Sequence, residues 1–227
     1  MMRPVNQTQQ TIPSGKGKPQ APMAPRWAAV LGMIAFGLLY AALPDRVTLG
    51  PNWLLLALEG AILIPLFLLG LAKRPLRNEI TRFLTLGLLA VITVALISGI
   101  ILFVITLPNK NASEAKVLLR TAALLWASNV LVFALWYWEI DGGGPKKRHE
   151  HGHQAADLMF PQQVNGNDGS WAPHFIDYLF VGFTTSTALS PTDTYPLTSR
   201  AKVLMMIEAL NAMAILGIIV GRIVNIL

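Results

Sequence analysis

Five long apolar runs, almost free of charged residues, constrain this chain more than any other feature. They cover residues 27–43, 53–72, 83–107, 117–138 and 201–227. At about 1.5 Å of helix per residue, runs of this length approach or exceed the roughly 30 Å hydrocarbon core of a bilayer. The pattern therefore predicts an all-α membrane protein with five transmembrane helices, the first three forming one region over residues 27–107.

The composition agrees with this fold class and argues against several functions. Hydrophobic residues make up 53% of the chain and charged residues 13%, about half the charged share of a soluble domain. The chain has no cysteine, so disulfides and thiolate sites are excluded. The sequence contains neither a nucleophile–base–acid set nor a phosphate-binding glycine loop, so we expect neither an enzyme nor a bound cofactor.

Basic residues are distributed unevenly and predict an orientation. Residues 1–26 form a polar segment that we expect to be a disordered tail. It and the connection after the second run carry most of the early basic residues, which are Arg3, Lys16, Lys18, Arg26, Lys73, Arg74, Arg77 and Arg82. By the positive-inside rule the N-terminus is cytoplasmic in a multi-pass protein of the cell membrane. The net charge of +6 then reflects orientation in a lipid bilayer and not a nucleic-acid partner.

The segment between the fourth and fifth runs differs from the rest. Residues 136–138 (Trp-Tyr-Trp) end the fourth run and resemble an interfacial aromatic belt. Residues 141–173 are glycine-rich and polar and predict a solvated loop. Residues 174–190 are half apolar and half hydroxyl-bearing, which favours a re-entrant half-helix. The alternative is that 174–190 spans fully, which would give six helices.

This C-terminal part resembles the pore module of the potassium-channel superfamily. The resemblance covers about 50 residues and rests on Asp177-Tyr178-Leu179-Phe180, Phe183-Thr184-Thr185-Ser186-Thr187, Asp193, Tyr195-Pro196 and Arg200. It implies a module over 117–227, with an outer helix (117–139), a loop (140–173), a pore helix (174–190) and an inner helix (199–227). It also implies a homo-oligomer, a tetramer in that family, and monovalent cations as partners.

The filter positions depart from the family. Its filter string corresponds here to Ala188, Leu189, Ser190, Pro191 and Thr192, so both filter glycines are missing. A row of carbonyls facing one axis needs backbone angles that glycine adopts easily. The resemblance therefore implies a non-selective or weakly selective cation channel near residues 184–193, and not a potassium-selective one.

Polar side chains within the apolar runs are the other candidate site residues. Glu59 and Glu208 lie in the second and last runs, with Arg120 as a possible partner of Glu59. They suggest either an ion or proton path or structural pairing between helices. Asn129 and Asn211 are explained by interhelical hydrogen bonds, which we favour over a transport role.

Two further clusters allow a structural and a functional interpretation. The hydroxyls of residues 184–187 either bond back to their own helix or line a pore. His149, His151 and His153 are weak candidates for a divalent cation, because three histidines in five residues are more often a solvated loop.

Three functions follow from these patterns. The first is a weakly selective cation channel, which the pore-module resemblance favours. The second is a proton-coupled carrier that uses Glu59 and Glu208. The third is a non-conducting membrane scaffold derived from a channel fold.

Overall fold

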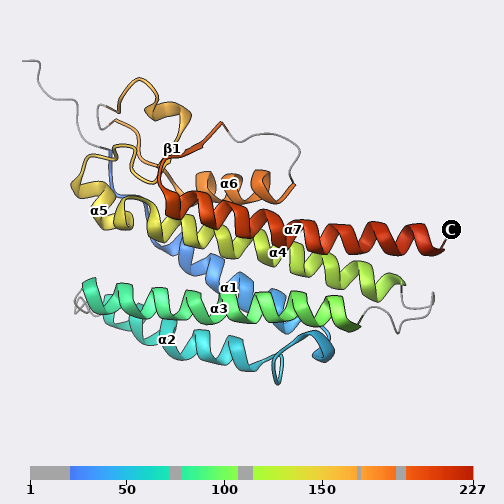
Figure 1. The fold of residues 1–227 in the computed structure, drawn as a ribbon. Coiled ribbons are helices and arrows are strands. Elements are labelled where there is room, and N and C mark those ends of the chain that lie inside the picture. Colours follow the sequence, from blue (N-terminus) through green and yellow to red (C-terminus); the bar gives the residue numbers. More distant parts are fainter. Residues whose placement is uncertain (1–20, 72–77, 107–114, 168–169, 188–192, 227) are drawn as a thin grey trace, which may run out of the picture.

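The computed structural model describes residues 21–71, 78–106, 115–167, 170–187 and 193–226, and this part of the chain is mostly helical. Helices of 13 to 29 residues form the body of the molecule (Figure 1). In chain order the helices are α1 (Trp27–Ala41), α2 (Leu54–Leu71), α3 (Asn78–Thr106), α4 (Ala115–Ile140), α5 (Pro145–Glu150), α6 (Phe175–Thr187) and α7 (Ser199–Ile226). Short 3-10 turns follow α1, α4 and β1, at η1 (Asp45–Val47), η4 (Asp141–Gly143) and η5 (Pro161–Gln163). The strands β1 (Leu158–Met159) and β2 (Tyr195–Pro196) pair antiparallel.

The long helices lie where the apolar runs predict them. Helices α3, α4 and α7 are long and apolar enough to cross a membrane, whereas α1 and the apolar part of α2 are shorter. The largest difference in a boundary is at α3, which begins at Asn78, five residues before its apolar run. Charged and polar residues can occupy a first helical turn, so an apolar run underestimates the length of its helix.

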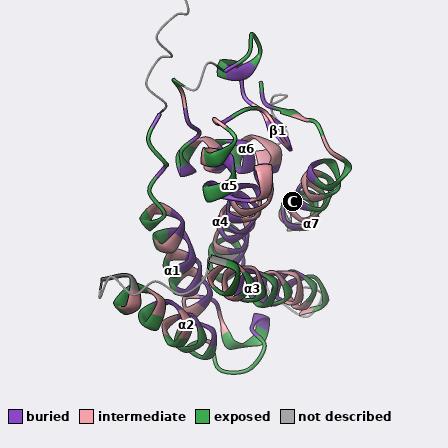
Figure 2. Ribbon diagram, turned by 90° about the vertical axis from the view of Figure 1, so that its left-hand side faces the viewer, coloured by how far each residue is buried: buried purple, intermediate pink, exposed green. Residues whose placement is uncertain are grey.

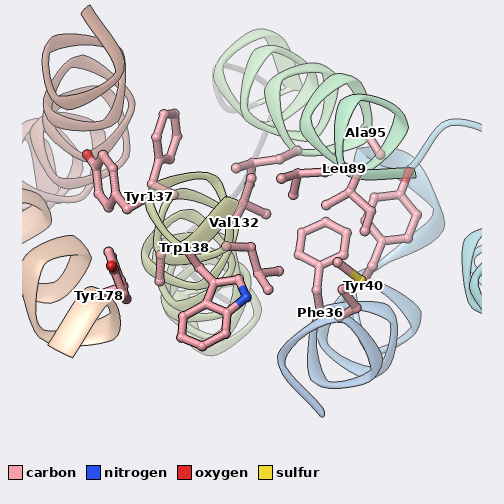
Figure 3. Close-up of a cluster of buried hydrophobic side chains, with 14 of the residues drawn as sticks. Phe36, Tyr40, Leu89, Ala95, Val132, Tyr137, Trp138 and Tyr178 are labelled. Carbon is pink, nitrogen blue, oxygen red and sulfur yellow. The ribbon is translucent and has the colours of Figure 1, made fainter. Parts of the chain in front are cut away.

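Helix α4 is the centre of the packing. It contacts α1 and α3 on one side and α6 and α7 on the other, while α2 packs against α1 and α3. Figure 3 shows Phe36 and Leu89 meeting Val132 on the first side and Tyr137 and Tyr178 on the second. Tyr137 and Trp138 are fully buried in this core. The prediction that residues 136–138 form an interfacial belt is therefore wrong for these two side chains.

The outer faces of the bundle carry many exposed residues (Figure 2), and large apolar side chains are common among them. On α7 they include Val203, Met206, Leu210, Met213 and Val220. A soluble monomer rarely exposes so much contiguous apolar surface. The exposed side chains therefore need either lipid or other protein to cover them.

The chain around α6 makes a short excursion along the bundle and returns. Helix α6 has 13 residues, about 20 Å of helix, and starts at the end of the bundle where α4 finishes (Figure 1). The chain then comes back to that end, where β2 pairs with β1 and α7 begins. The expected half-helix at 174–190 is thus a helix over 175–187, and residues 188–190 lie outside the described part.

Side-chain caps define where α6 and α7 begin. The backbone N–H of His174 donates to Asp177 Oδ2 at 2.7 Å, which is half of a capping box. At α7 the N–H of Ala201 donates to Thr198 Oγ1 at 3.4 Å, the usual bond from an N-cap hydroxyl. Both helix starts therefore have a local cause in the sequence.

The connection from 141 to 173 is more ordered than a solvated loop. It contains η4, α5, β1 and η5, and several of its polar residues are buried, namely Asp141, Arg148, His153, Asp157, Gln163 and Asn167. Hydrogen bonds among these groups replace the water that a loop would use. Of the expected disordered tail, residues 1–20 lie outside the described part, whereas Ala21 and Ala24 are buried.

Candidate functional site

A buried polar network joins α4, α6 and α7 in the middle of the C-terminal half. We call Asn129, Tyr137, Ser186, Glu208 and Asn211 the Glu208 network. Its first four members are at most 1% exposed. Three helices thus direct hydrogen-bonding side chains to one point inside an apolar bundle.

Both oxygens of the Glu208 carboxyl accept a hydrogen bond. The Tyr137 hydroxyl donates to Oε2 at 2.5 Å, and the Ser186 hydroxyl donates to Oε1 at 2.8 Å. A buried carboxyl without donors would be strongly destabilising, so these two bonds compensate for its removal from water. Glu208 therefore ties α7 both to the last turn of α4 and to the last turn of α6.

The amide of Asn129 completes the network. Its Nδ2 donates to Ser186 Oγ and to the backbone oxygen of Glu208, each at 3.1 Å. Its Oδ1 accepts a hydrogen bond from Asn211 Nδ2 at 3.2 Å. The predicted interhelical hydrogen bonds of the two asparagines are thus confirmed, and they join α4 to α6 and α7.

A glycine allows α6 to approach α4 this closely. A Cβ atom at Gly182 would lie 2.8 Å from the backbone oxygen of Val130 and 3.3 Å from Glu208 Oε1. The first distance is too short for any real side chain, and a backbone atom cannot move aside cheaply. Gly182 therefore sets the spacing at which Ser186 reaches Glu208.

The predicted hydroxyl run divides into two kinds of residue. Thr184 and Thr187 donate to backbone oxygens of their own helix, as expected from the structural interpretation. Ser186 instead joins the Glu208 network, and Thr185 is half-buried. The described part of the chain does not include the filter-like residues, which are Ala188, Leu189, Ser190, Pro191 and Thr192. The next residue, Asp193, is described and is exposed.

A second polar cluster holds the end of the bundle where α4 finishes and α7 begins. We call Asp141, Arg148, Asp157, Tyr178 and Arg200 the end cluster. Asp141 accepts hydrogen bonds from the Tyr178 hydroxyl at 2.6 Å and from the N–H groups of residues 157 and 158. The Arg148 guanidinium donates to the backbone oxygens of residues 138 and 141 and lies over the rings of Trp138 and Tyr178. Two acids and two bases thus balance in charge.

Asp157 connects the end cluster to α7. It pairs with Arg200 and accepts hydrogen bonds from Thr198 Oγ1 at 2.7 Å and from the N–H of Gly142 at 3.0 Å. Burial acts to raise the pKa of Asp157, but these hydrogen bonds and the charge of Arg200 outweigh it and hold the pKa below its ordinary value. The carboxylate of Asp157 therefore ties the beginning of α7 to the 141–157 segment.

Glu59 lies in a different setting from Glu208. It is buried between α1 and α2, and neither carboxyl oxygen accepts a hydrogen bond within the described part of the chain. Arg120 is exposed on α4. The proposed pairing of Arg120 with Glu59 is therefore wrong, and no hydrogen bond among the described residues links Glu59 to the Glu208 network.

The three histidines do not converge. His149 Nδ1 lies 3.2 Å from His153 Nε2, whereas His151 Nδ1 bonds to the backbone oxygen of Lys147. Within the described ranges, no three His, Cys, Asp or Glu side chains are placed to hold a metal ion. Burial lowers the pKa of His153, and the nearby His149 and Arg148 lower it further against one backbone hydrogen bond that raises it.

Sequence reasoning missed Tyr137 and most of the end cluster. Tyr137 lies eight residues after Asn129 on α4, a spacing that places both on one stripe of a helix. That spacing was the available signal, but the neighbouring tryptophans favoured a membrane interface. Arg200 is among the residues that carry the pore-module resemblance, but nothing in the sequence indicated that it pairs with Asp157, which lies 43 residues earlier.

No family model matches this chain, and no curated protein or solved structure matches it either. The resemblance to a potassium-channel pore module thus stays a prediction from the residues alone.

Proposed function

We propose that the chain is a multi-pass membrane protein whose C-terminal half is a channel-like pore module conducting monovalent cations with little selectivity. The observation that carries the proposal is the course of α6. This short helix is packed against α4 and α7 at its sides, and the chain returns to the end from which α6 started (Figure 1). A half-helix with a return segment is the arrangement by which polar backbone is placed at membrane depth.

The direction of α6 favours a cation. The C-terminal end of a helix carries partial negative charge, because its last carbonyl groups have no intrahelical partner. Here that end is held inside the bundle by the bond from Ser186 to Glu208. Asp193, the first described residue after α6, is an exposed acid. A cation near residues 187–193 would meet the helix end and a carboxylate together.

The proposal includes five spans, with α6 as a re-entrant half-helix, and a cytoplasmic N-terminus. The arrangement of the basic residues supports it. Helices α1 and α3 begin, and α5 lies, at the end of the bundle at which α4 finishes (Figure 1). Arg26 directly precedes α1, Arg82 is in the second turn of α3, and residues 146–148 belong to α5. In the sequence, the basic N-terminal tail directly precedes α1 and the basic connection 72–77 directly precedes α3. The positive-inside rule places such an end in the cytoplasm.

Conduction would need several copies. The exposed faces of α6 and α7 are apolar, with Phe180, Phe183, Met206 and Leu210 among the exposed side chains. Association of these faces would bring the α6 ends and the Asp193 carboxylates of neighbouring copies around one axis. A homo-oligomer, four-fold by the family resemblance, is therefore part of the proposal.

Ion flux from liposomes that hold the purified protein tests the proposal. We expect sodium and potassium to leave at similar rates, and Asp193→Asn to reduce the flux or change the preference for cations over anions. Asp45→Asn is the matched control. Asp45 is also an exposed acid, but it lies in η1 between α1 and α2 and away from α6, so its substitution should leave the flux unchanged. Equal effects of the two substitutions would contradict a cation path at Asp193.

One observation favours a non-conducting scaffold as the second candidate. The exposed residues of α7 named above are all apolar. An oligomer that formed through this face would bury apolar side chains and would not enclose a water-filled path lined by polar groups. An intact oligomer that passes no ion at any voltage or pH would select the scaffold. Flux that Asp193→Asn alters would exclude it.

A further inference from the structure

The interface between α1 and α2 contains a buried carboxyl group outside the site described above. Glu59 lies in the second turn of α2 and is 1% exposed. Both of its oxygens are enclosed, and neither accepts a hydrogen bond from any described residue. This separates Glu59 from Glu208, whose two oxygens each have a donor.

The position of the carboxyl is set by a glycine of α1. A Cβ atom at Gly37 would lie 2.1 Å from Glu59 Oε2 and 2.8 Å from a methyl carbon of Leu56. The carboxyl group therefore occupies the space that any other residue at position 37 would need. Such a fit means that Glu59 is seated between the helices and does not reach outward along the surface of α2.

The described helices around Glu59 offer no positive charge in their apolar parts. Residues 27–41, 54–71 and 83–106 belong to the three helices packed together here, and Glu59 is the one acid or base among them. Helix α1 also contains Tyr40, whose side chain can ionise. Its hydroxyl lies at the 42–53 connection, where it accepts a hydrogen bond from the N–H of Leu49. Asp45 and Arg46 of that connection are exposed.

We propose that Glu59 is a proton-binding site whose carboxyl group is neutral in the resting protein. An ionised carboxylate with neither counter-charge nor donor is strongly disfavoured in an apolar interior, whereas the protonated acid is not. Intramembrane acids are usually paired or functional, and the described residues offer Glu59 no pair. Glu59 lies one to two turns from the 42–53 connection, so its proton exchanges with the side of the membrane that this connection faces.

Infrared difference spectroscopy on the full-length protein in lipid tests the protonation state directly. Subtracting the Glu59→Gln spectrum from that of the native protein should reveal the C=O stretch of a carboxylic acid without a carboxylate pair. Carboxylate bands in the difference spectrum at neutral pH would overturn the proposal. Thermal unfolding of the variant checks that both samples are folded.

Labelling with a hydrophobic carbodiimide is a second test that needs no variant to fold. A protonated carboxyl transfers its proton to a nitrogen of the carbodiimide while its oxygen adds to the central carbon. The adduct rearranges to a stable N-acylurea with no leaving group. We expect mass spectrometry to find this mass on the peptide that contains Glu59, decreasing as the pH rises.

Glu208 is the internal control for the labelling. It is also a buried glutamate in an apolar helix, but its oxygens are occupied by Tyr137 and Ser186. In the native protein, labelling should therefore be stronger at Glu59 than at Glu208. Equal labelling of Glu59 and Glu208 in the native protein would contradict the proposal that Glu59 differs from Glu208 in holding a reactive, protonated carboxyl. If sodium or lithium ions at constant pH protected Glu59 from labelling, the site would bind a metal cation and the proposed proton site would be wrong.

These outcomes are independent of ion conduction. Glu59 lies between α1 and α2, whereas Asp193 lies between α6 and α7 in the chain, so the flux experiment on Asp193→Asn reports only on the α6 region. A neutral Glu59 in a protein without flux would leave the proton site in place and remove the channel.

Discussion

The two buried glutamates differ in what surrounds them, and this difference decides how each responds to substitution. Glu208 receives one donor on each oxygen, whereas Glu59 receives none from the described residues. A carboxyl group with two donors is a structural junction, because removing it leaves those donors buried without an acceptor. A carboxyl group without donors leaves no orphaned partner when it is replaced.

Glu208→Gln should therefore destabilise the protein. The glutamine amide nitrogen cannot accept from Tyr137 or Ser186, so one buried donor loses its partner at a cost of about 1–3 kcal/mol. Thermal unfolding in detergent should show a lower midpoint for Glu208→Gln than for the native protein. Glu150→Gln is the control, since Glu150 is exposed at the end of α5 and should leave the midpoint unchanged. An unchanged midpoint in Glu208→Gln would show that the network carries no stability.

Local composition explains which residues could be predicted. The interhelical bonds of Asn129 and Asn211 were predictable, because an amide inside an apolar run must find a partner. The burial of Asp141, Arg148 and Asp157 was not, because a charged, glycine-rich segment is typical of solvated loops. Their compensation comes partly from Tyr178 and Arg200, far along the chain. No pattern within the segment itself reveals such partners.

Helix α6 depends on its contact with α4 more than on its own length. A helix of 13 residues is marginal in isolation, so packing must hold it in place. The two helices lie close together at Gly182, where a Cβ atom would be only 2.8 Å from the backbone of α4. The position of α6 was predictable from the half-apolar sequence, but this close approach was not.

Gly182→Ala should push α6 away from α4. The added methyl group meets the backbone oxygen of Val130, and relief of such overlap typically costs about 1–3 kcal/mol. We expect a lower unfolding midpoint and weaker protection of the 175–187 amides in hydrogen exchange.

Gly87→Ala is the matched control, because nothing lies within 4 Å of a Cβ atom at Gly87 in the middle of α3. Alanine is the better helix former by up to about 1 kcal/mol, so this variant should be as stable as the native protein or more stable. The same loss of stability in both variants would mean that the close approach at Gly182 has no special role.

At the scale of the whole molecule, the two ends of the bundle differ in chemical character. One end carries the ordered 141–167 segment, the end cluster and several basic residues. The other carries the short 42–53 connection, with one exposed acid and one exposed base, and the beginning of α4, with the exposed Lys116 and Arg120. This difference underlies the proposed orientation and leads to a direct test.

Single cysteines should report opposite sides of the membrane. The native chain has no cysteine, so Ser170→Cys and Leu49→Cys can be labelled without background. A membrane-impermeant maleimide added to intact cells should label Leu49→Cys and should reach Ser170→Cys only after the membrane is opened. Both positions are exposed, so differences in burial do not interfere. Labelling of Ser170→Cys in intact cells would reverse the proposed orientation.

The Glu208 network also has a consequence for how the protein is made. Asn129 and Tyr137 leave the ribosome about 80 and 70 residues before the groups of Glu208 that they bond, as their sequence separations of 79 and 71 residues show. During synthesis the amide and phenol of α4 must stay in contact with water, lipid headgroups or the insertion machinery until α7 is released. Docking of α7 is then the step that completes the Glu208 network, and a chain truncated before residue 208 would keep α4 without the carboxyl that Tyr137 binds.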